Sequence, residues 1–189
     1  MEQIVRRAPS PDPATPQNRP YCCAFTGYRL QKLPFSFDER DPRFLSLSRR
    51  LYAEVEMLIL EGYTHFISGG AIGFDLLAAE AVLSLRKRYP WGVLEVAIPC
   101  DGQDTLWDPA WRSRRQCVLR EADIITRTGR EYTPRVMQTR NEYMVQRADL
   151  LMACYDGQRG GTENTLRYAE RLGRHIIVLP PTAPLLKAG

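Results

Sequence analysis

The chain has 189 residues, of which 44% are hydrophobic and 25% are charged. This length and composition favour one globular domain with a real core and leave too little chain for two full domains. The net charge is only +4 and the basic residues are scattered, so the composition gives weak support for nucleic-acid binding.

Five cysteines are present and none forms a CxxC pair, which argues against a disulfide framework and against a zinc site. Free thiols fit a reducing compartment, so a cytoplasmic location is expected. The chain contains no apolar run of membrane-spanning length, and the start of the sequence does not have the pattern of a signal peptide. No metal, no firm cofactor and no membrane partner are therefore predicted.

The ends of the chain differ from its middle. Residues 1–20 are rich in proline and small polar residues, which predicts a disordered tail, and residues 181–189 form a shorter predicted tail. Between them, residues 21–180 are predicted to form the domain. Strands are expected at 21–27, 64–70, 92–100, 123–127, 149–157 and 175–181, and helices at 44–62, 74–89, 105–121, 138–147 and 162–172.

Most of these strands are short and continuously apolar, and helices separate them. This alternation predicts a mainly parallel sheet covered on both faces, which is a Rossmann-like doubly wound α/β domain. Such sheets bind ligands in a crevice at the carboxyl ends of their strands. The polar residues that follow each strand are thus the candidate site residues.

The first strand ends in "FTGYR", which places Thr26, Gly27 and Arg29 at this edge. An arginine there can pair with a phosphate group or with a surface carboxylate. Arg140 and Asn141 stand in "TRNEYM", at the start of a predicted helix. The arginine is a forked donor for phosphate and the asparagine can read a base or a ribose, while the alternative is a solvated helix start.

The second strand ends in "SGGAIGFD", which runs from Ser68 to Asp75 and contains Gly69, Gly70 and Gly73. Glycine before a helix permits a positive φ and lets an anion approach the unpaired N–H groups of the helix start. The alternative is a tight turn that needs glycine only for its shape. Asp75 would repel a phosphate, so it suits ribose hydroxyls better, or it caps the helix.

A second glycine-rich junction, "GQRGGTENT", follows the predicted strand at 149–157. Gly160 and Gly161 give access to the backbone, and Thr162 can cap the helix or donate its hydroxyl group to a phosphate. Two such junctions in one parallel sheet predict a shared crevice. The patterns GxGxxG and GxxxxGK[ST] are absent, which argues against an ordinary NAD enzyme and against a P-loop ATPase.

The segments "CAFTGYR", "HFISGGAIGFDLLAAE", "LEVAIPC", "RNEYMVQRADLLMACYDG" and "RGGTENTLRYAERLGRHIIVL" occur in this order over about residues 21 to 180. The set resembles the bacterial YpsA-like (DUF1273) family of the SLOG superfamily, which includes DprA and the LOG ("lonely guy") phosphoribohydrolases. The resemblance implies a Rossmann-like fold, a pocket for a nucleotide or an ADP-ribose-like derivative, and no established reaction. It maps the pocket to Gly27, Arg29, Ser68, Gly69, Gly70, Gly73, Asp75, Arg140, Asn141, Gly160, Gly161 and Thr162.

Three functions are compatible with this resemblance. The first is a regulatory protein that binds a nucleotide. The second is a LOG-like hydrolase of an N-glycosidic bond. The LOG enzymes resemble PGGxGTxxE, whereas this chain has "RGGTENT", so the catalytic carboxylate would have to come from Asp75 or Glu163. The third is a DprA-like module that binds single-stranded DNA or a protein. A homodimer formed through a helical face is compatible with all three.

Overall fold

The computed structural model describes residues 1–5, 20–35 and 38–182. In these residues seven strands form one sheet in the order β1-β5-β4-β3-β2-β6-β7. The strands β2 to β7 are parallel, and β1 pairs antiparallel with β5 at the edge. Their bounds are β1 Glu2–Val5, β2 Tyr21–Gly27, β3 Tyr63–Ser68, β4 Val93–Ile98, β5 Ile124–Arg127, β6 Leu150–Cys154 and β7 His175–Leu179.

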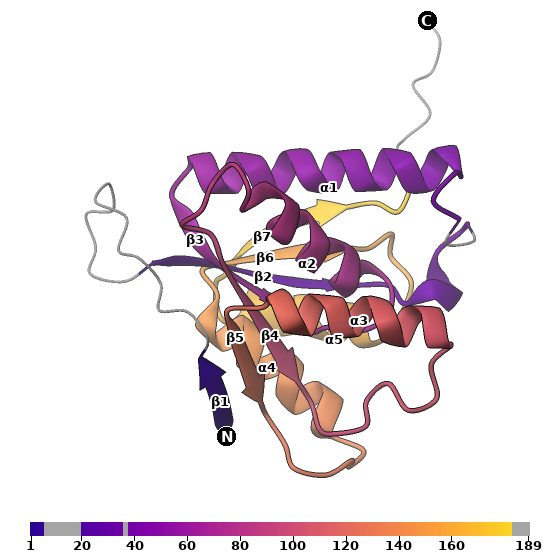
Figure 1. Cartoon of the computed structure of the whole chain (residues 1–189), viewed down its shortest axis with the longest axis vertical. Helices are drawn as coiled ribbons and strands as arrows, with labels where there is room; N and C mark the ends of the chain where they lie inside the picture. The colour runs from indigo at the N-terminus through magenta and orange to yellow at the C-terminus, as the bar shows by residue number, and fades with distance from the viewer. Residues whose placement is uncertain (6–19, 36–37, 183–189) are drawn as a thin grey trace, which may run out of the picture.

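Two groups of helices cover the sheet (Figure 1). Helices α1, α2 and α3 pack together on one face, and α4 and α5 pack together on the other. This arrangement confirms the predicted doubly wound α/β fold. The bounds are α1 Pro42–Leu60, α2 Phe74–Leu85, α3 Pro109–Glu121, α4 Val136–Arg147 and α5 Gly161–Arg171, with a short 3₁₀ helix, η1, at Leu30–Lys32.

The apolar spacing of α1 explains how it packs. Phe44, Leu47, Leu51, Val55 and Leu58 recur every three or four residues and are all buried. This periodicity places them on one stripe of the helix, which faces the core between the sheet and its first layer of helices. Burial of each large side chain contributes about 1.5–3 kcal/mol to folding.

Several predicted elements end earlier or begin later than expected. The helix predicted at 105–121 begins at Pro109, because the Asp108 side chain accepts a hydrogen bond of 2.8 Å from the backbone N–H of Ala110 and caps the helix there. The helix predicted at 74–89 ends at Leu85. The predicted strands keep their places, with ends that differ by up to three residues.

The strand β1 has no counterpart among the predicted strands, because it lies inside the segment expected to be a tail. Its backbone pairs with β5, and Gln3 and Glu2 add side-chain hydrogen bonds to Thr126 at 3.2 Å and to Arg127 at 3.0 Å. Four residues carry no periodic signal of their own, so only the neighbouring edge of the sheet makes them a strand. Residues 6–19 and 183–189 lie outside the described residues, and the predicted domain limits remain predictions.

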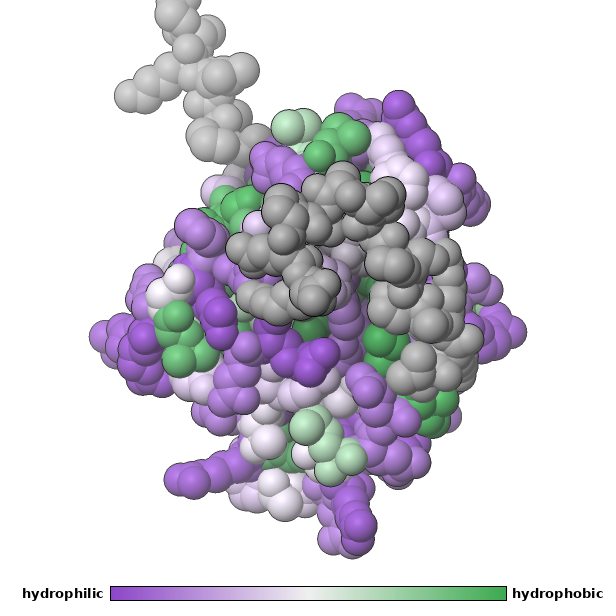
Figure 2. All heavy atoms as spheres, turned by 90° about the vertical axis from the view of Figure 1, so that its left-hand side faces the viewer, coloured by the Kyte–Doolittle hydropathy of each residue, from purple (hydrophilic) through white to green (hydrophobic). Residues whose placement is uncertain are grey.

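The hydrophobic side chains of the protein lie mostly in its interior. Outside the grey segments, the face shown in Figure 2 is largely hydrophilic, and its hydrophobic side chains lie in small separate patches. Among the described residues, no helix combines the length and the hydrophobicity that spanning a bilayer requires.

A buried carboxylate lies between the sheet and α4. The carboxylate of Glu95 is fully buried and lies 2.7 Å from His65 Nε2, and it accepts hydrogen bonds from Thr126 at 2.7 Å and Tyr143 at 2.6 Å. His65 and Glu95 are 30 positions apart in the sequence, so it is the fold that brings them together. Burial acts to raise the pKa of Glu95, but the hydrogen bonds from these three side chains outweigh it and hold the pKa below its ordinary value.

Removal of the Tyr143 hydroxyl group is expected to destabilise the protein. Tyr143→Phe should lower the free energy of unfolding by about 1.5–3 kcal/mol at neutral pH, because it deletes a hydrogen bond to a buried charge. A lowered pKa in the folded state means that the stabilisation is present at neutral pH and is lost as the pH falls through that pKa. The effect of the substitution should therefore shrink on acidification.

Urea unfolding at neutral and at acidic pH measures both effects. The matched control is Tyr132→Phe, since Tyr132 is 74% exposed in the loop before α4. Equal losses for the two variants would show that the Tyr143 hydroxyl group contributes nothing to the network.

Candidate functional site

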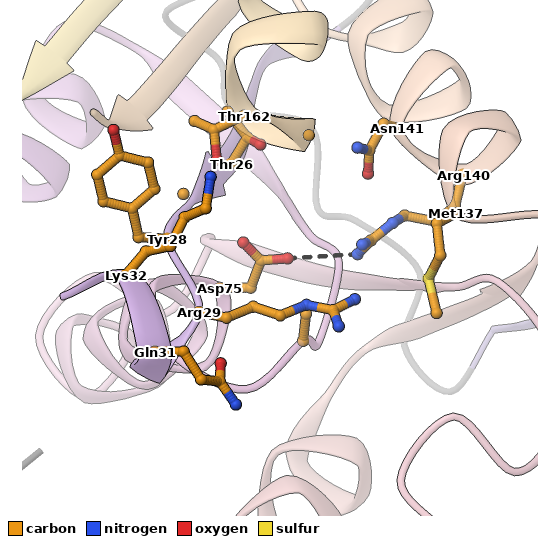
Figure 3. Close-up of a pocket in the computed structure, with 13 residues that line it drawn as sticks. Thr26, Tyr28, Arg29, Gln31, Lys32, Asp75, Met137, Arg140, Asn141 and Thr162 are labelled. Atoms are coloured by element: carbon orange, nitrogen blue, oxygen red, sulfur yellow. Dashed lines mark hydrogen bonds and ion pairs between the residues drawn. The ribbon is translucent and has the colours of Figure 1, made fainter. Parts of the chain in front are cut away.

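The sheet has a switch point beside β2, between this strand and its neighbour β6. From β2 the chain continues through α1 on one face to β3, whereas the helix that follows the other neighbour, β6, lies on the opposite face. The segments that leave β2 and β6 therefore diverge, which opens a crevice at the carboxyl ends of the strands. A cavity of about 400 Å³ lies there (Figure 3).

The cavity collects residues from four parts of the chain. The segment after β2, the start of α2, the first half of α4 and the start of α5 all reach it. Its lining residues are Thr26, Gly27, Tyr28, Arg29, Gln31, Lys32, Ala71, Asp75, Met137, Arg140, Asn141, Gly161 and Thr162. Three of them are cationic and one is acidic, so the charges of the cavity favour an anionic ligand.

The acidic residue is paired with one of the cations. Arg140 Nη1 lies 3.3 Å from Asp75 Oδ2, and the two side chains are only 5% and 7% exposed. Burial raises the pKa of Asp75 against the attraction of Arg140, and burial lowers the pKa of Arg140. The Arg140 Nε is buried and has no hydrogen-bond partner among the described residues, so this guanidinium group keeps donor capacity beside the cavity.

Glycine makes room for this pair. A Cβ atom at Gly69 would overlap both the Arg140 guanidinium group and the Asp75 carboxylate. Ser68 supports the same turn, since its hydroxyl group donates to the backbone carbonyl of Asp75 at 2.7 Å and accepts from the Gly70 N–H at 3.1 Å. Ser68, Gly69 and Gly70 thus lie behind the cavity and hold its acidic residue in place.

The segment after β2 forms one wall of the cavity. The Tyr28 hydroxyl group donates to Asp156 Oδ1 at 2.5 Å and accepts from the backbone N–H groups of Asp156 and Gln158 at 3.2 and 3.1 Å. Lys32 Nζ donates to the Arg159 carbonyl at 2.5 Å. These bonds tie the segment after β2 to the loop between β6 and α5, so the two sides of the crevice are fixed relative to each other.

The start of α5 forms the opposite wall. Gly160 is the N-cap with φ of +148°, and no side chain caps the helix, so Thr162 does not have the capping role that was one of its two predicted roles. The first N–H groups of a helix have no partner within it. A Cβ at Gly161 would meet no atom within 4 Å, so this residue faces open space.

The structure brings together most of the predicted site residues. The residues that line the cavity are Thr26, Gly27, Arg29, Asp75, Arg140, Asn141, Gly161 and Thr162, whereas Ser68, Gly69, Gly70, Gly73 and Gly160 do not line it. The prediction missed Gln31, Lys32 and Met137, as well as Tyr28 and Ala71. The polar run that follows β2 was a usable signal for Gln31 and Lys32, and Met137 lies one helical turn before Arg140.

Comparison with known proteins places the chain in a family. Residues 23–173 match the YpsA family, described as the YspA SLOG family, and the chain belongs to this family. It is 34% identical over 157 residues to YoqJ, an SPbeta prophage-derived protein of Bacillus subtilis, over 75% of this chain and 92% of YoqJ. A UPF0398 protein of Halalkalibacterium halodurans is 32% identical over 140 residues, which cover 72% of this chain and 73% of the relative.

Solved structures show the same fold at lower identity. The DNA processing protein A (DprA) of Helicobacter pylori, described with a single-stranded DNA binding mode, superimposes with a TM-score of 0.59 at 19% identity over 88% of this chain and 67% of that chain. DprA of Streptococcus pneumoniae gives a TM-score of 0.59 at 17% identity over 89% of this chain and 52% of that chain. At these identities the likeness concerns the fold alone.

Proposed function

We propose that this protein binds a nucleotide or an ADP-ribose-like derivative in the cavity beside β2, and that it acts as a sensor or regulator rather than as an enzyme. The observation that carries the proposal is the composition of the cavity. Arg29, Lys32 and Arg140 surround it, the uncapped start of α5 opens into it, and its one acidic residue is already paired. A cavity of about 400 Å³ lies within the range of small-molecule sites.

Each wall suits one part of a nucleotide. The phosphate group lies on the N–H groups of Gly161 and Thr162, where the helix dipole favours an anion. Lys32 and Arg29 neutralise the phosphate charge from the facing wall. The carboxylate of Asp75 accepts hydrogen bonds from the ribose hydroxyl groups, as an acidic residue does in dinucleotide sites.

A panel of ligands tests the proposal by thermal unfolding. The panel contains nucleoside mono-, di- and triphosphates, ADP-ribose, NAD and cyclic dinucleotides. A ligand at one hundred times its dissociation constant should stabilise the protein by roughly 2.7 kcal/mol, which raises Tm by several degrees. No shift with any member of the panel would count against a nucleotide site.

Gly161→Val should abolish this shift, because its side chain blocks the approach of the phosphate to the backbone. The matched variant is Gly161→Ala, which should weaken binding less. Since a Cβ at this position meets no protein atom within 4 Å, both variants should fold, and their Tm without ligand checks this. If Gly161→Val bound the nucleotide with full affinity, the phosphate could not lie at the start of α5.

A second candidate function is hydrolysis of the N-glycosidic bond of a nucleotide. The observation that favours it is the raised pKa of the buried Asp75, the one carboxylate among the lining residues. A carboxyl group tuned in this way suits general acid–base work. Release of free base from the nucleotide panel, lost in Asp75→Asn, would support the hydrolase, and no turnover across the panel would exclude it.

The third candidate function is binding of single-stranded DNA. It is suggested by the fold that the chain shares with the DprA of Helicobacter pylori. A mobility-shift assay at two salt concentrations tests it, since phosphate contacts weaken steeply with salt. The absence of any shift at low salt would remove this candidate. A homodimer and a cytoplasmic location remain predictions.

A further inference from the structure

A second hollow adjoins the cavity. It has a volume of about 660 Å³, lies between α4 and α5, and shares Met137, Asn141 and Gly161 with the cavity. We refer to it as the α4–α5 groove. Its lining residues are Pro134, Met137, Gln138, Asn141, Gly161, Asn164, Arg167 and Arg171. A ligand that leaves the cavity past Gly161 enters this groove.

The groove carries positive charge. Two arginines line it, and none of its lining residues is acidic. Arg167 pairs with Glu163 at 2.7 Å, one turn earlier on α5. The Arg171 guanidinium group stacks over the Tyr168 ring at 5.3 Å, and within the described part of the chain it has no ion pair with a carboxylate. Of the two arginines, Arg171 is thus the one whose charge is available to a ligand.

The middle of the groove has a different chemistry. Gln138, Asn141 and Asn164 contribute carboxamide groups, and Met137 contributes an apolar surface. The Asn141 Nδ2 donates to Thr165 Oγ1 at 2.9 Å, which fixes this amide and leaves its oxygen as an acceptor. Carboxamides beside an apolar side chain suit a base, which has hydrogen-bonding edges and an apolar face.

The length of α5 determines which anions can contact both the start of the helix and Arg171 at its end. Gly161 and Arg171 are ten residues apart, which corresponds to about 15 Å along the helix axis. Two directly linked phosphates are too close together to reach from the start of α5 to the Arg171 side chain. Two phosphates separated by a nucleoside span much more of this distance.

We propose that the ligand is a linear 5′-phosphorylated dinucleotide that occupies the cavity and the α4–α5 groove together. Its internal phosphate lies at the start of α5 beside the buried Arg140, whose Nε has no partner among the described residues. One nucleoside then occupies the cavity, with its ribose on Asp75, and the other occupies the groove. The 5′-phosphate lies on Arg171, with Arg167 beside it. This inference rests on the proposed function and specifies the class of ligand.

Titration calorimetry at low salt with full-length protein tests the inference. The probes are mixed-base linear dinucleotides with a 5′-phosphate, the corresponding 5′-mononucleotides, and a mixed-base hexanucleotide. The dinucleotides should bind about tenfold more tightly than the mononucleotides. Arg171→Gln should remove this advantage and leave mononucleotide affinity unchanged. Arg49→Gln, an exposed arginine of α1 on the opposite face of the sheet, should change neither affinity.

The outcomes separate this inference from the proposed function. Mononucleotide binding that is lost in Gly161→Val, with no advantage for the dinucleotide, would overturn the inference and leave the proposed function standing. No binding of any probe would overturn both. A hexanucleotide that binds much more tightly than the dinucleotide would show that the groove serves a nucleic-acid strand, and would overturn the dinucleotide.

Discussion

Asp75→Ala is expected to lower the free energy of unfolding by about 3–5 kcal/mol, because it leaves the Arg140 charge buried without its partner. Both side chains are more than nine-tenths buried, so water cannot replace the lost carboxylate without a rearrangement. The loss is large beside the total stability of a typical domain, which is about 5–15 kcal/mol. Urea unfolding in the absence of ligand measures it.

The control is a double-mutant cycle with Arg140→Met. If the pair carries the effect, Arg140→Met should cost much less in the Asp75→Ala background than in the original protein. Inorganic phosphate should raise the Tm of Asp75→Ala more than that of the original protein, since it supplies the missing negative charge. A loss below about 1 kcal/mol would mean that Arg140 reaches solvent freely.

The second large effect is expected at Gly73, the N-cap residue of α2. Its φ is +107°, and a Cβ there would overlap the carbonyl oxygen of Tyr28, which also accepts a hydrogen bond of 3.1 Å from the Phe74 N–H. Gly73→Ala combines backbone strain with a clash against backbone atoms. We expect a loss of about 3–5 kcal/mol in the free energy of unfolding, as the sum of the two penalties.

Gly157→Ala separates the two penalties. Gly157 has a similar φ of +101°, but a Cβ there meets no atom within 4 Å. Its substitution should cost only the strain, about 1–2 kcal/mol. Urea unfolding of both variants measures the difference, and equal losses would show that the contact with Tyr28 is not constraining. The comparison concerns the site directly, because Tyr28 lines the cavity.

Two glycines shape this site without lining its cavity. Gly69 and Gly73 lie outside the cavity, yet one gives space to the Arg140–Asp75 pair and the other lets α2 approach the segment after β2. The tight-turn interpretation of "SGGAIGFD" therefore accounts for these two positions. The other interpretation, in which glycine lets an anion approach the backbone, fits Gly161 better, because that residue faces free space.

The class of fold and the edge of the sheet that carries the cavity can both be predicted from the amino-acid sequence. Alternating apolar strands and periodic helices are local signals, and in a parallel sheet they leave few topologies. Glycines and polar residues after the strands mark the same edge, so local patterns suffice to identify a set of lining residues: Gly27, Arg29, Asp75, Arg140, Asn141, Gly161 and Thr162. The continuous strand and helix patterns also predict which segments are buried.

The pairing of these residues depends instead on how the elements pack in three dimensions. Asp75 and Arg140 are 65 positions apart, and the ion pair between them depends on how α2 and α4 meet across the sheet edge. The partner of His65, the strand β1 and the contribution of Lys32 to the cavity also depend on residues distant in the sequence. Such contacts leave no periodic trace, because each is fixed by packing between elements rather than by the conformation of its own segment.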